Sequence, residues 1–480
     1  MLQPAGLELS NKLKTIGNYA FQDFRVPKVT IPDSVTSIGE GAFQRAGGYE
    51  GLVIGSGVNT IGDRAFSGME MTEVVLTSTV TSVGDGLFAD CGNLKTATID
   101  CEIVTANMFS GCNSLETVIL GDNVKTIEAG AFENLPALKT VSGGKNVTSV
   151  GDGAYKGCAA LESITSTAAF GTSTKILDNH FQGCSSLTNI TIPDTINEIG
   201  ENAFADSSIK TLSIPDTVTK IGAYAFAGSD IETLSIPDTV TELGDYAFKD
   251  SGIKSITISN NITKIGEGTF SGCTSLESVT LHNNITDIEK EAFKDCTSLE
   301  SITLPTSLTT INESAFIGSG LKSVHIPDNV LTMGVRAFQG SALETVTFGN
   351  GLTEISASAF QNCYSLHTVT IPGTIEVIRD SAFADCGALS NLTIEDGVGQ
   401  IGKLAFNSVG ITTLHIPASV HTIGYQAFAG CEQLTTAYYY GKTSPTFEVS
   451  SNEFRYSLAF NGCTKLYIMR VPCEIGRAHV

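Results

Sequence analysis

The stretch LKSVHIPDNVLTMGVRAF, at residues 321–338, carries in order the features that decide the fold. Val324 and Ile326 alternate with polar residues, which is the period-two pattern of a strand with one buried face. Pro327 ends this strand because proline has no N–H to give to a ladder. We expect the Ala-Phe pair at 337–338 to lie on a short helical or 3₁₀ turn.

The same pattern recurs through almost the whole chain, with an aromatic anchor that usually follows a small residue, most often alanine. The anchors are Phe21, Phe43, Phe66, Phe88, Phe109, Phe132, Tyr155, Phe181, Phe204, Phe226, Phe248, Phe270, Phe293, Phe316, Phe338, Phe360, Phe383, Phe406 and Phe428. Successive anchors are 21 to 23 residues apart, except for 26 before Phe181, and a last copy, Phe460, follows after 32. A unit this small cannot bury its apolar face alone, but stacked neighbours can. The sequence therefore predicts a solenoid.

Two other residue types keep register with the anchor. A glycine follows isoleucine, as at Ile61-Gly62 and Ile221-Gly222, which indicates either positive φ or close packing of backbone. Ten of the 12 cysteines lie three residues after an anchor: Cys91, Cys112, Cys158, Cys184, Cys273, Cys296, Cys363, Cys386, Cys431 and Cys463. Coils without this cysteine usually carry serine there and are one residue shorter. The column suits buried small hydrophobes, disulfides between adjacent coils or, least of all, metal ligands.

The pattern L-x-x-[IVL]-[TSH]-[IL]-P-x-x-[VI]-x-x-I-G-x-x-A-F-x-x-C resembles the BspA-type, or Treponema-type, leucine-rich repeat. Residues from Leu13 to about Leu434 fit it, with weaker copies near Leu52 and between Thr98 and Tyr155. The resemblance implies a β-rich solenoid of the α/β-type leucine-rich repeat horseshoe class, with about 20 coils of 21–23 residues. One face would be a parallel sheet, and the other would carry short strands and short helical or 3₁₀ turns. The family's members are mostly thought to be surface-exposed binding or adhesion proteins.

The charge of the chain is strongly negative. With 28 Lys plus Arg against 50 Asp plus Glu, the formal net charge is −22, which argues against nucleic acid or an anionic membrane as the main partner. No apolar run approaches the roughly 20 residues of a membrane-spanning helix. The surplus acid follows Pro, as at Asp238 and Asp328, or Gly, as at Asp63 and Asp245. These two acidic ridges suit solvated turns or, alternatively, weak and diffuse Ca²⁺ binding.

Strands stacked in this way place side chains in columns roughly 4.8 Å apart. Two outward columns are rich in short hydroxyls. The first is Thr191, Ser213, Ser235, Thr257, Thr280, Thr303, His325, Thr347, Thr370, Thr393, His415 and Tyr438, and the second is Asn189, Thr211, Thr233, Ser255, Ser278, Ser301, Ser323, Thr345, Thr368, Asn391, Thr413 and Thr436. A third column alternates in sign, as at Lys95, Glu116, Lys139 and Glu162, and so places opposite charges on adjacent strands. The hydroxyl columns suit either sheet propensity with solubility or an adhesive face.

Patterns of catalytic or metal chemistry are missing from the sequence. None of the seven histidines lies at zinc-ligand spacing from a cysteine or another histidine, and no HExxH motif occurs. There is no GxSxG elbow, phosphate-binding loop or dinucleotide fingerprint after a strand. We therefore expect no enzyme activity, no catalytic residue, no bound metal and no cofactor.

Our leading hypothesis is a non-catalytic, surface-exposed recognition or adhesion module that binds a protein or glycan through the repeated sheet face. The partner would belong to a host surface or the extracellular matrix. The alternative is a purely structural extracellular spacer or stalk, and an enzyme is the third hypothesis. Candidate binding residues are the departures from the hydroxyl columns, where aromatic side chains favour contact: His325, His367, His415, Tyr438 and Tyr440.

The ends of the chain depart from the repeat. We expect residues 1–436 to form the solenoid, 437–473 an irregular last coil or C-terminal cap, and 474–480 a non-native tail. The first coil begins mid-repeat, so we expect an N-terminal cap to be missing. Residues 1–10 show no signal-peptide pattern, and a cell-surface or secreted location is implied by the resemblance alone.

Overall fold

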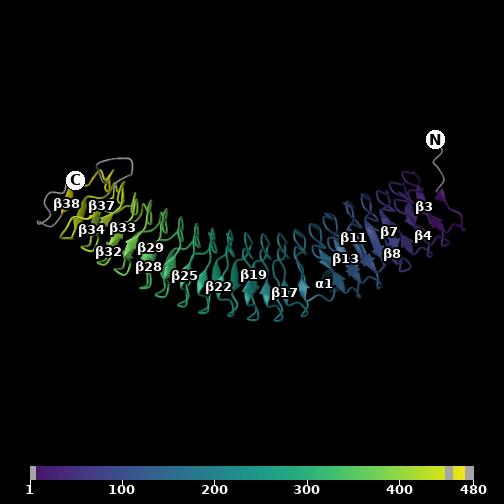
Figure 1. Cartoon of the computed structure of the whole chain (residues 1–480), viewed down its shortest axis with the longest axis horizontal. Helices are drawn as coiled ribbons and strands as arrows, with labels where there is room; N and C mark the ends of the chain where they lie inside the picture. Colours follow the sequence, from purple (N-terminus) through teal and green to yellow (C-terminus); the bar gives the residue numbers. More distant parts are fainter. Residues whose placement is uncertain (1–6, 449–457, 471–480) are drawn as a thin grey trace. The chain divides into compact units, whose positions relative to one another are not determined.

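The computed structural model describes residues 7–448 and 458–470, and only the backbone of 468–470. The tail expected at 474–480 lies outside the described residues. The chain divides into two compact units, Met1–Ile231 and Glu232–Val480, which we describe separately as unit 1 and unit 2. Within each unit the chain winds into coils that stack in sequence order (Figure 1). The predicted solenoid of parallel strands is confirmed.

Most coils contribute one strand to a front sheet, which precedes the proline turn, and a shorter strand to a back sheet, which precedes the glycine. In unit 1 the front strands are β1 (Leu7–Glu8), β3 (Lys28–Thr30), β5 (Gly51–Val53), β7 (Glu73–Leu76), β9 (Thr96–Ile99), β11 (Thr117–Leu120), β13 (Thr140–Gly143) and β15 (Ser163–Ile164). The back strands are β2 (Thr15–Ile16), β4 (Ser37–Ile38), β6 (Thr60–Ile61), β8 (Ser82–Val83), β10 (Ile103–Val104), β12 (Thr126–Ile127), β14 (Ser149–Val150), β16 (Lys175–Ile176), β17 (Glu198–Ile199) and β18 (Lys220–Ile221).

Unit 2 repeats this arrangement. Its front strands are β19 (Thr233–Ser235), β21 (Ser255–Thr257), β23 (Ser278–Thr280), β26 (Ser323–Ile326), β28 (Thr345–Phe348), β30 (Thr368–Ile371), β32 (Asn391–Ile394), β34 (Thr413–Ile416), β36 (Thr436–Tyr439) and β38 (Ile468–Arg470). Its back strands are β20 (Glu242–Leu243), β22 (Lys264–Ile265), β24 (Asp287–Ile288), β25 (Thr310–Ile311), β27 (Thr332–Met333), β29 (Glu354–Ile355), β31 (Val377–Ile378), β33 (Gln400–Ile401), β35 (Thr422–Ile423) and β37 (Thr446–Phe447). The front strands form separate sheets of three to five strands rather than one continuous sheet.

The register between coils is parallel and places equivalent residues side by side. Val324 of β26 lies opposite Val346 of β28, and the outward His325 lies opposite Thr347. The side chains of β26 alternate between exposed and buried, as the sequence pattern predicted. Inside each unit the anchor rings stack at centroid distances between 5.0 and 5.9 Å, which joins each coil to the next through an aromatic column.

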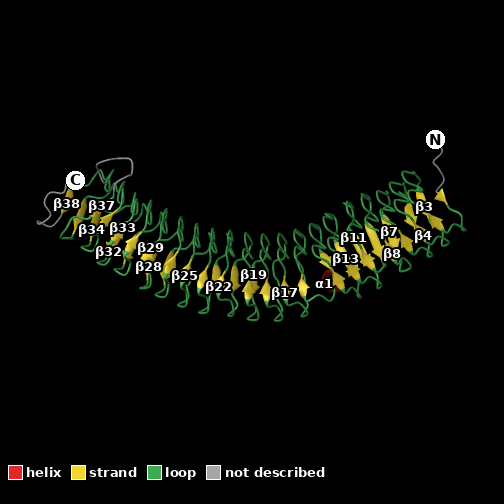
Figure 2. Cartoon of the chain, in the orientation of Figure 1, coloured by secondary structure: helices red, strands yellow, loops and turns green. Residues whose placement is uncertain are grey.

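The prediction of helical or 3₁₀ turns at the Ala-Phe pairs is wrong. Strands and turns make up nearly all of the described residues (Figure 2), and the turn around Phe338 shows why. Arg336 and Gly340 have φ values of 59° and 68°, and a left-handed residue at every fourth position interrupts any run of helical dihedrals. The N–H of Phe338 instead donates to the carbonyl of Ala359 in the next coil at 2.8 Å. The turns are thus a third line of backbone pairing between coils.

The glycines before the turns are explained by close packing and not by positive φ. Gly62 has an ordinary φ, and its N–H donates to the carbonyl of Ile38 in the preceding coil at 2.8 Å. A Cβ at Gly62 would lie 2.6 Å from the backbone nitrogen of Glu40 and 2.8 Å from the carbonyl carbon of Gly39. Only glycine lets the two backbones approach this closely.

The 26-residue coil before Phe181 holds α1 (Ser166–Phe170), a helix that we did not predict from the sequence. The helix ends at Gly171, whose φ is 56° and whose N–H donates to the carbonyl of Thr167. Its Ala169 carbonyl accepts from His180 Nε2 at 2.7 Å, and Tyr155 Oη donates to the Ala168 carbonyl at 2.6 Å. His180 is almost fully buried, so desolvation lowers its pKa to about 4.

Replacing Gly62 by Ala tests the close approach. We expect a loss of about 1–3 kcal/mol in the free energy of unfolding of unit 1, because the Cβ must displace the backbone of the preceding coil. Gly17→Ala is the matched control: Gly17 holds the same place in the first coil, and a Cβ there meets nothing within 4 Å. Urea unfolding at 25 °C measures both variants. Equal effects of the two substitutions would contradict the packing argument.

Acid should weaken the coil that holds α1. The folded pKa of His180 is about 4 against 6.5 unfolded, so its contribution is fully present above pH 6.5 and falls as pH drops toward 4. Between pH 7.5 and pH 5 we expect local stability to fall by about 2 kcal/mol. Hydrogen exchange of the amides of 166–181 measures this loss, and His180→Phe should abolish its pH dependence. His421→Phe, at an exposed position, is the control and should leave that pH dependence intact.

Candidate binding surface

The outward side chains of the front sheet in unit 2 are mostly hydroxyls without hydrogen-bond partners among the described residues. Two of the serine and threonine hydroxyls in the two outward columns are hydrogen bonded within the described part of unit 2. Thr347 Oγ1 pairs with His325 Nδ1 at 2.9 Å, and Thr368 Oγ1 accepts from Asn391 Nδ2 at 3.5 Å. The remaining hydroxyls stand free for water or a ligand.

Threonines just before the back strands behave differently. Thr309 Oγ1 donates to the carbonyl of Thr286 in the preceding coil at 3.0 Å, and Thr286 Oγ1 in turn donates to the carbonyl of Thr263 at 3.2 Å. These hydroxyls donate hydrogen bonds to backbone carbonyls of the preceding coil and so stabilise the fold. The threonine hydroxyls of the two positions thus differ in whether they bond to the backbone of the solenoid.

The alternating charge column forms the ion pairs that we predicted. Lys322 Nζ lies 2.6 Å from Glu300, and Lys254 Nζ lies 2.7 Å from Glu232 in the neighbouring coil of unit 2. All four side chains are well exposed, so each pair contributes little to stability. The column is nearly neutral, and the net negative charge of the chain lies elsewhere.

The acidic residues at the turns are engaged by backbone N–H groups of the next coil. After proline, Asp328 Oδ1 accepts from the N–H of Asn350 at 2.9 Å, and after glycine, Asp245 Oδ1 accepts from the N–H of Glu267 at 3.0 Å. The equivalent bonds from Asn260 lower the pKa of Asp238. These carboxylates link coils, and no three His, Cys, Asp or Glu side chains group as metal ligands in residues 7–448 and 458–470.

The structure brings together three of the five predicted binding residues. The rings of His415 and Tyr438 stack at 4.8 Å with 6° between their planes, and Tyr440 joins them with its ring 5.9 Å from His415. Tyr440 Oη and His415 Nδ1 are hydrogen bonded at 2.7 Å. Tyr440 is half exposed, so this aromatic cluster gives one end of the front face of unit 2 a different chemistry from the hydroxyl columns.

The other two predicted residues lie apart from this cluster. His325 is four front strands from His415, or roughly 19 Å at strand spacing. His367 does not interrupt a hydroxyl column as predicted: Thr368 is the partner of Thr345, so His367 aligns with Glu344 in the charge column. The register also places Tyr440 one step beyond the Ile416–Tyr439 pair, at the position where other coils have proline. Both assignments to the hydroxyl columns were wrong.

The cysteine column is buried, and its thiols hydrogen bond to the aromatic column. Cys273 Sγ donates to the carbonyl of the preceding anchor, Phe248, at 2.8 Å, and Cys296 Sγ donates to that of Phe270 at 3.1 Å. The ten thiols that follow an anchor all make this bond to the preceding coil. Burial raises the pKa of Cys273 to about 12. Eleven cysteines of the described residues are free thiols in the structure.

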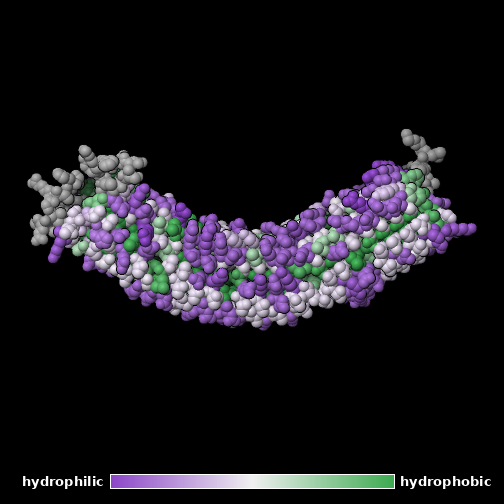
Figure 3. Space-filling view, viewed as in Figure 1, coloured by the Kyte–Doolittle hydropathy of each residue, from purple (hydrophilic) through white to green (hydrophobic). Residues whose placement is uncertain are grey.

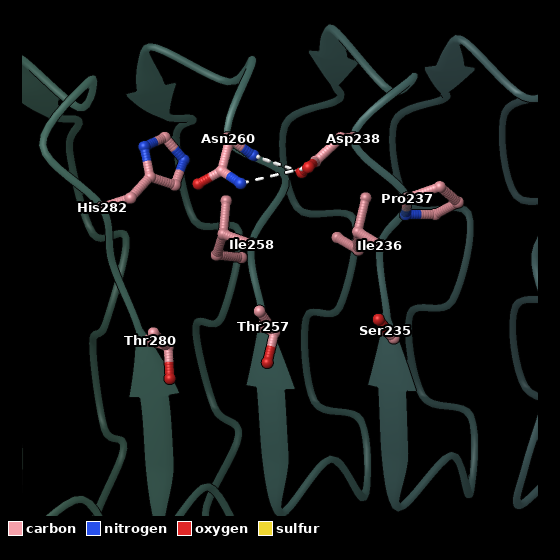
Figure 4. Close-up of a pocket in the computed structure, with 9 residues that line it drawn as sticks. All are labelled: Ser235, Ile236, Pro237, Asp238, Thr257, Ile258, Asn260, Thr280 and His282. Atoms are coloured by element: carbon pink, nitrogen blue, oxygen red, sulfur yellow. Dashed lines mark hydrogen bonds between the residues drawn. The ribbon is translucent and has the colours of Figure 1, made fainter. Parts of the chain in front are cut away.

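An open hollow of about 330 Å³ lies in unit 2 at the upper ends of β19, β21 and β23 (Figure 4). Its floor is apolar and consists of Ile236 and Ile258, with Pro237 at one end and the half-buried ring of His282 at the other. The remaining lining is polar and comprises Ser235, Thr257, Thr280, Asp238 and Asn260. The sequence analysis did not identify this site, although Ser259 and His282 replace the proline found at 237 and 305 and so marked it.

In unit 1 the outward column mixes exposed aliphatic residues with hydroxyls. Val53, Val75 and Ile119 expose 46%, 54% and 42% of their surfaces, and Val75 and Ile119 flank Thr98 in the register of β7, β9 and β11. Figure 3 shows hydrophobic residues as a band between hydrophilic rows over these strands. This change was not predicted from the sequence, where the hydroxyl columns were followed only from Thr191 and Asn189 onward.

Comparison with known families accounts for the whole repeat. The BspA type leucine rich repeat region, a family described by six copies of its repeat, matches residues 5–116, 102–232, 219–344 and 319–435. These spans together cover most of the chain. The chain belongs to the BspA-type leucine-rich repeat family. Leucine-rich repeats of this family fit a protein-interaction or surface module, and such families are generally non-catalytic.

This BspA-type protein is similar to several solved structures of leucine-rich repeat proteins. A leucine-rich repeat protein from Bacteroides ovatus is similar at 24% identity and a TM-score of 0.57, over 74% of this chain and 86% of its own. A leucine-rich repeat protein from Eubacterium ventriosum has 23% identity and a TM-score of 0.40, over 68% and 80% of the two chains. A leucine rich cell surface protein from Faecalibacterium prausnitzii has 22% identity and a TM-score of 0.29, over 80% and 84%. No curated protein matches this chain.

The helix α1 has five residues, and no helix in the part of the chain that the structure describes is long and apolar enough to cross a bilayer.

The thiol column of this BspA-type protein predicts a sharp difference in reactivity between the native and the unfolded chain. At pH 8 we expect iodoacetamide to modify Cys158 and Cys273 at least about 100-fold more slowly in the native state, because burial raises each thiol pKa to about 12. Cys463, which is only half buried, should react first. In denaturant without reductant, at least eleven thiols should titrate. A count below ten would indicate disulfides between coils.

Proposed function

We propose that this protein is a non-catalytic recognition module of the cell surface, which adheres to a protein or glycan partner through the front sheet of its solenoid. The partner would be carried by a host surface or by the extracellular matrix. The observation that supports the proposal is the set of outward hydroxyls in unit 2 that have no partner in the part of the chain that the structure describes. A ligand can take hydrogen bonds from them without breaking any bond of the fold.

The repetition of the columns suits weak contacts made many times. Each hydroxyl provides one donor and two acceptor positions. The next strand carries another such hydroxyl roughly 4.8 Å away. A partner that engages several coils gains affinity from multivalency although each contact is weak. The near neutrality of the charge column leaves the face without a net repulsion toward acidic or basic partners.

The aromatic cluster of His415, Tyr438 and Tyr440 gives this face its best anchor. Tyrosine provides large contact area together with a polar tip, which is why it is enriched where proteins bind their partners. The hydrogen bond between His415 and Tyr440 holds these two rings in place before a partner arrives. A pre-ordered contact loses less side-chain entropy on binding. His325 and His367 would act as separate secondary contacts.

Substitution of the front face tests the proposal. The full chain is screened by surface plasmon resonance against extracellular-matrix proteins and a glycan array, and the double variant Thr370→Lys/Thr393→Lys is then measured against each hit. We expect at least tenfold weaker binding, because two lysines would crowd and charge the exposed outward column of β30 and β32. The matched control, Thr332→Lys/Gln400→Lys, changes exposed back-strand positions and should bind normally.

The screen separates the competing hypotheses. Binding that survives the front-face substitutions would contradict the proposed surface. The alternative of a purely structural spacer predicts no hit in either screen. His415→Ala should weaken binding by about tenfold if the aromatic cluster is an anchor.

A further inference from the structure

The geometry points to a saccharide subsite: the hollow bounded by Pro237, Asn260 and His282 binds one neutral monosaccharide unit of a glycan. The inference deepens the proposed function, on which it rests for the presence of a glycan at this surface. The inference rests on the shape of the hollow, on the polar atoms left available in it, and on the absence of Lys and Arg among its lining residues.

The hollow exists because one coil turns its side chain inward. At the end of the front strand, the neighbouring coils carry Pro237 and His282, both of which reach the surface. The coil between them carries Ser259, which is fully buried and donates from Oγ to the carbonyl of Val240 at 2.7 Å. The place between the proline and the imidazole is therefore empty of side chain. A recess one coil wide results, and its floor is the buried Ile258.

The histidine at the end of the hollow is committed to the fold and presents a ring to the ligand rather than a donor. Its Nδ1 accepts from the N–H of Asn284 at 3.2 Å, and its Nε2 pairs with the carbonyl of Ser259. With one nitrogen accepting and the other donating, the neutral imidazole has both positions filled. His282, Pro237 and the isoleucine floor thus supply apolar contact for the C–H groups of a small ring.

The available polar atoms above the floor are mostly acceptors. Asp238 receives two bonds from Asn260, from its backbone N–H at 2.9 Å and from Nδ2 at 3.1 Å, which fixes the orientation of the amide. The amide oxygen of Asn260 has no partner among the described residues, and each carboxylate oxygen keeps one further acceptor position. Thr257 and Thr280 line the lower side of the hollow, and their hydroxyl oxygens point down the strands, away from Asn260 and His282 (Figure 4).

The groups that line the hollow determine which chemical class of ligand fits it. The acceptors of Asp238 and Asn260, above an apolar floor, match a ring that carries several hydroxyl donors. No Lys or Arg lines the hollow, so an anionic sugar would meet the Asp238 carboxylate without compensation. A volume of about 330 Å³ is at the low end of ligand pockets and limits the occupant to one sugar unit.

Ligand-observed NMR on the full chain tests the subsite with the methyl glycosides of glucose, galactose, mannose and N-acetylglucosamine. We expect one or more to bind with a Kd on the order of 1 mM, and glucuronic acid to bind at least about tenfold more weakly. Asn260→Ala removes the unpartnered amide oxygen and should raise the Kd about tenfold. The matched control is Asn350→Ala, because Asn350 makes the same clamp with Asp328 and does not line the hollow.

A filling variant keeps the test independent of the Asn260 loop. Thr257→Phe should block the hollow and abolish binding, whereas Thr370→Phe, at the same place in the outward column but remote from the hollow, should leave the Kd unchanged. No binding of any neutral glycoside, or equal Kd values for Asn260→Ala and Asn350→Ala, would overturn the inference.

The two proposals fail separately. Thr370→Lys/Thr393→Lys should weaken binding of a macromolecular partner at least about tenfold and leave the glycoside Kd unaltered. If a partner binds the front face and no glycoside binds, the subsite is wrong and the proposed function stands. If a glycoside binds the hollow and no partner binds the front face, the subsite stands and the proposed surface is wrong.

Discussion

The structure depends on one constraint, the pairing of each coil's backbone with the next coil at strand spacing. The pairing occurs in three places: along the front strands, along the back strands and through the turns that carry Phe338 and its equivalents. Gly62 is glycine because the backbones meet at this distance. The aromatic rings, the thiols and the turn carboxylates fill or bridge the same interval between coils. Each repeated residue type therefore fits the same distance between neighbouring coils in a different way.

Much of the fold could be predicted because the constraint repeats. Nineteen successive anchors gave the period, and the alternation at Val324 and Ile326 gave the strand and its buried face. The turns could not be predicted, because Arg336 adopts a positive φ that its own sequence does not favour. Backbone pairing to the next coil imposes that conformation. The helix α1 was missed for the opposite reason: it belongs to one irregular coil and has no copies from which to read it.

The candidate site, like the fold, could be predicted from the sequence only in part. Register arguments identified the hydroxyl columns and brought His415 and Tyr438 to one place, since both follow from counting along the repeat. They misplaced His367 by one column, because a one-residue error moves a side chain to a different row. The hollow could not be predicted, since it depends on the inward turn of Ser259 and on what its two neighbours do. A site that depends on three neighbouring coils gives only a weak signal in the sequence. Here the signal is Ser259 and His282 at the position where other coils have proline.

The recess above Ser259 shows how a repetitive protein can diversify. Most binding proteins build a pocket by inserting a loop, which adds chain and disturbs its surroundings. Here a pocket arises by subtraction: one coil withdraws a side chain, while its neighbours and its backbone ladder stay as they are. The solenoid thus consists of about twenty similar coils, and a change of side chain in one coil can alter what the surface binds while the fold is kept.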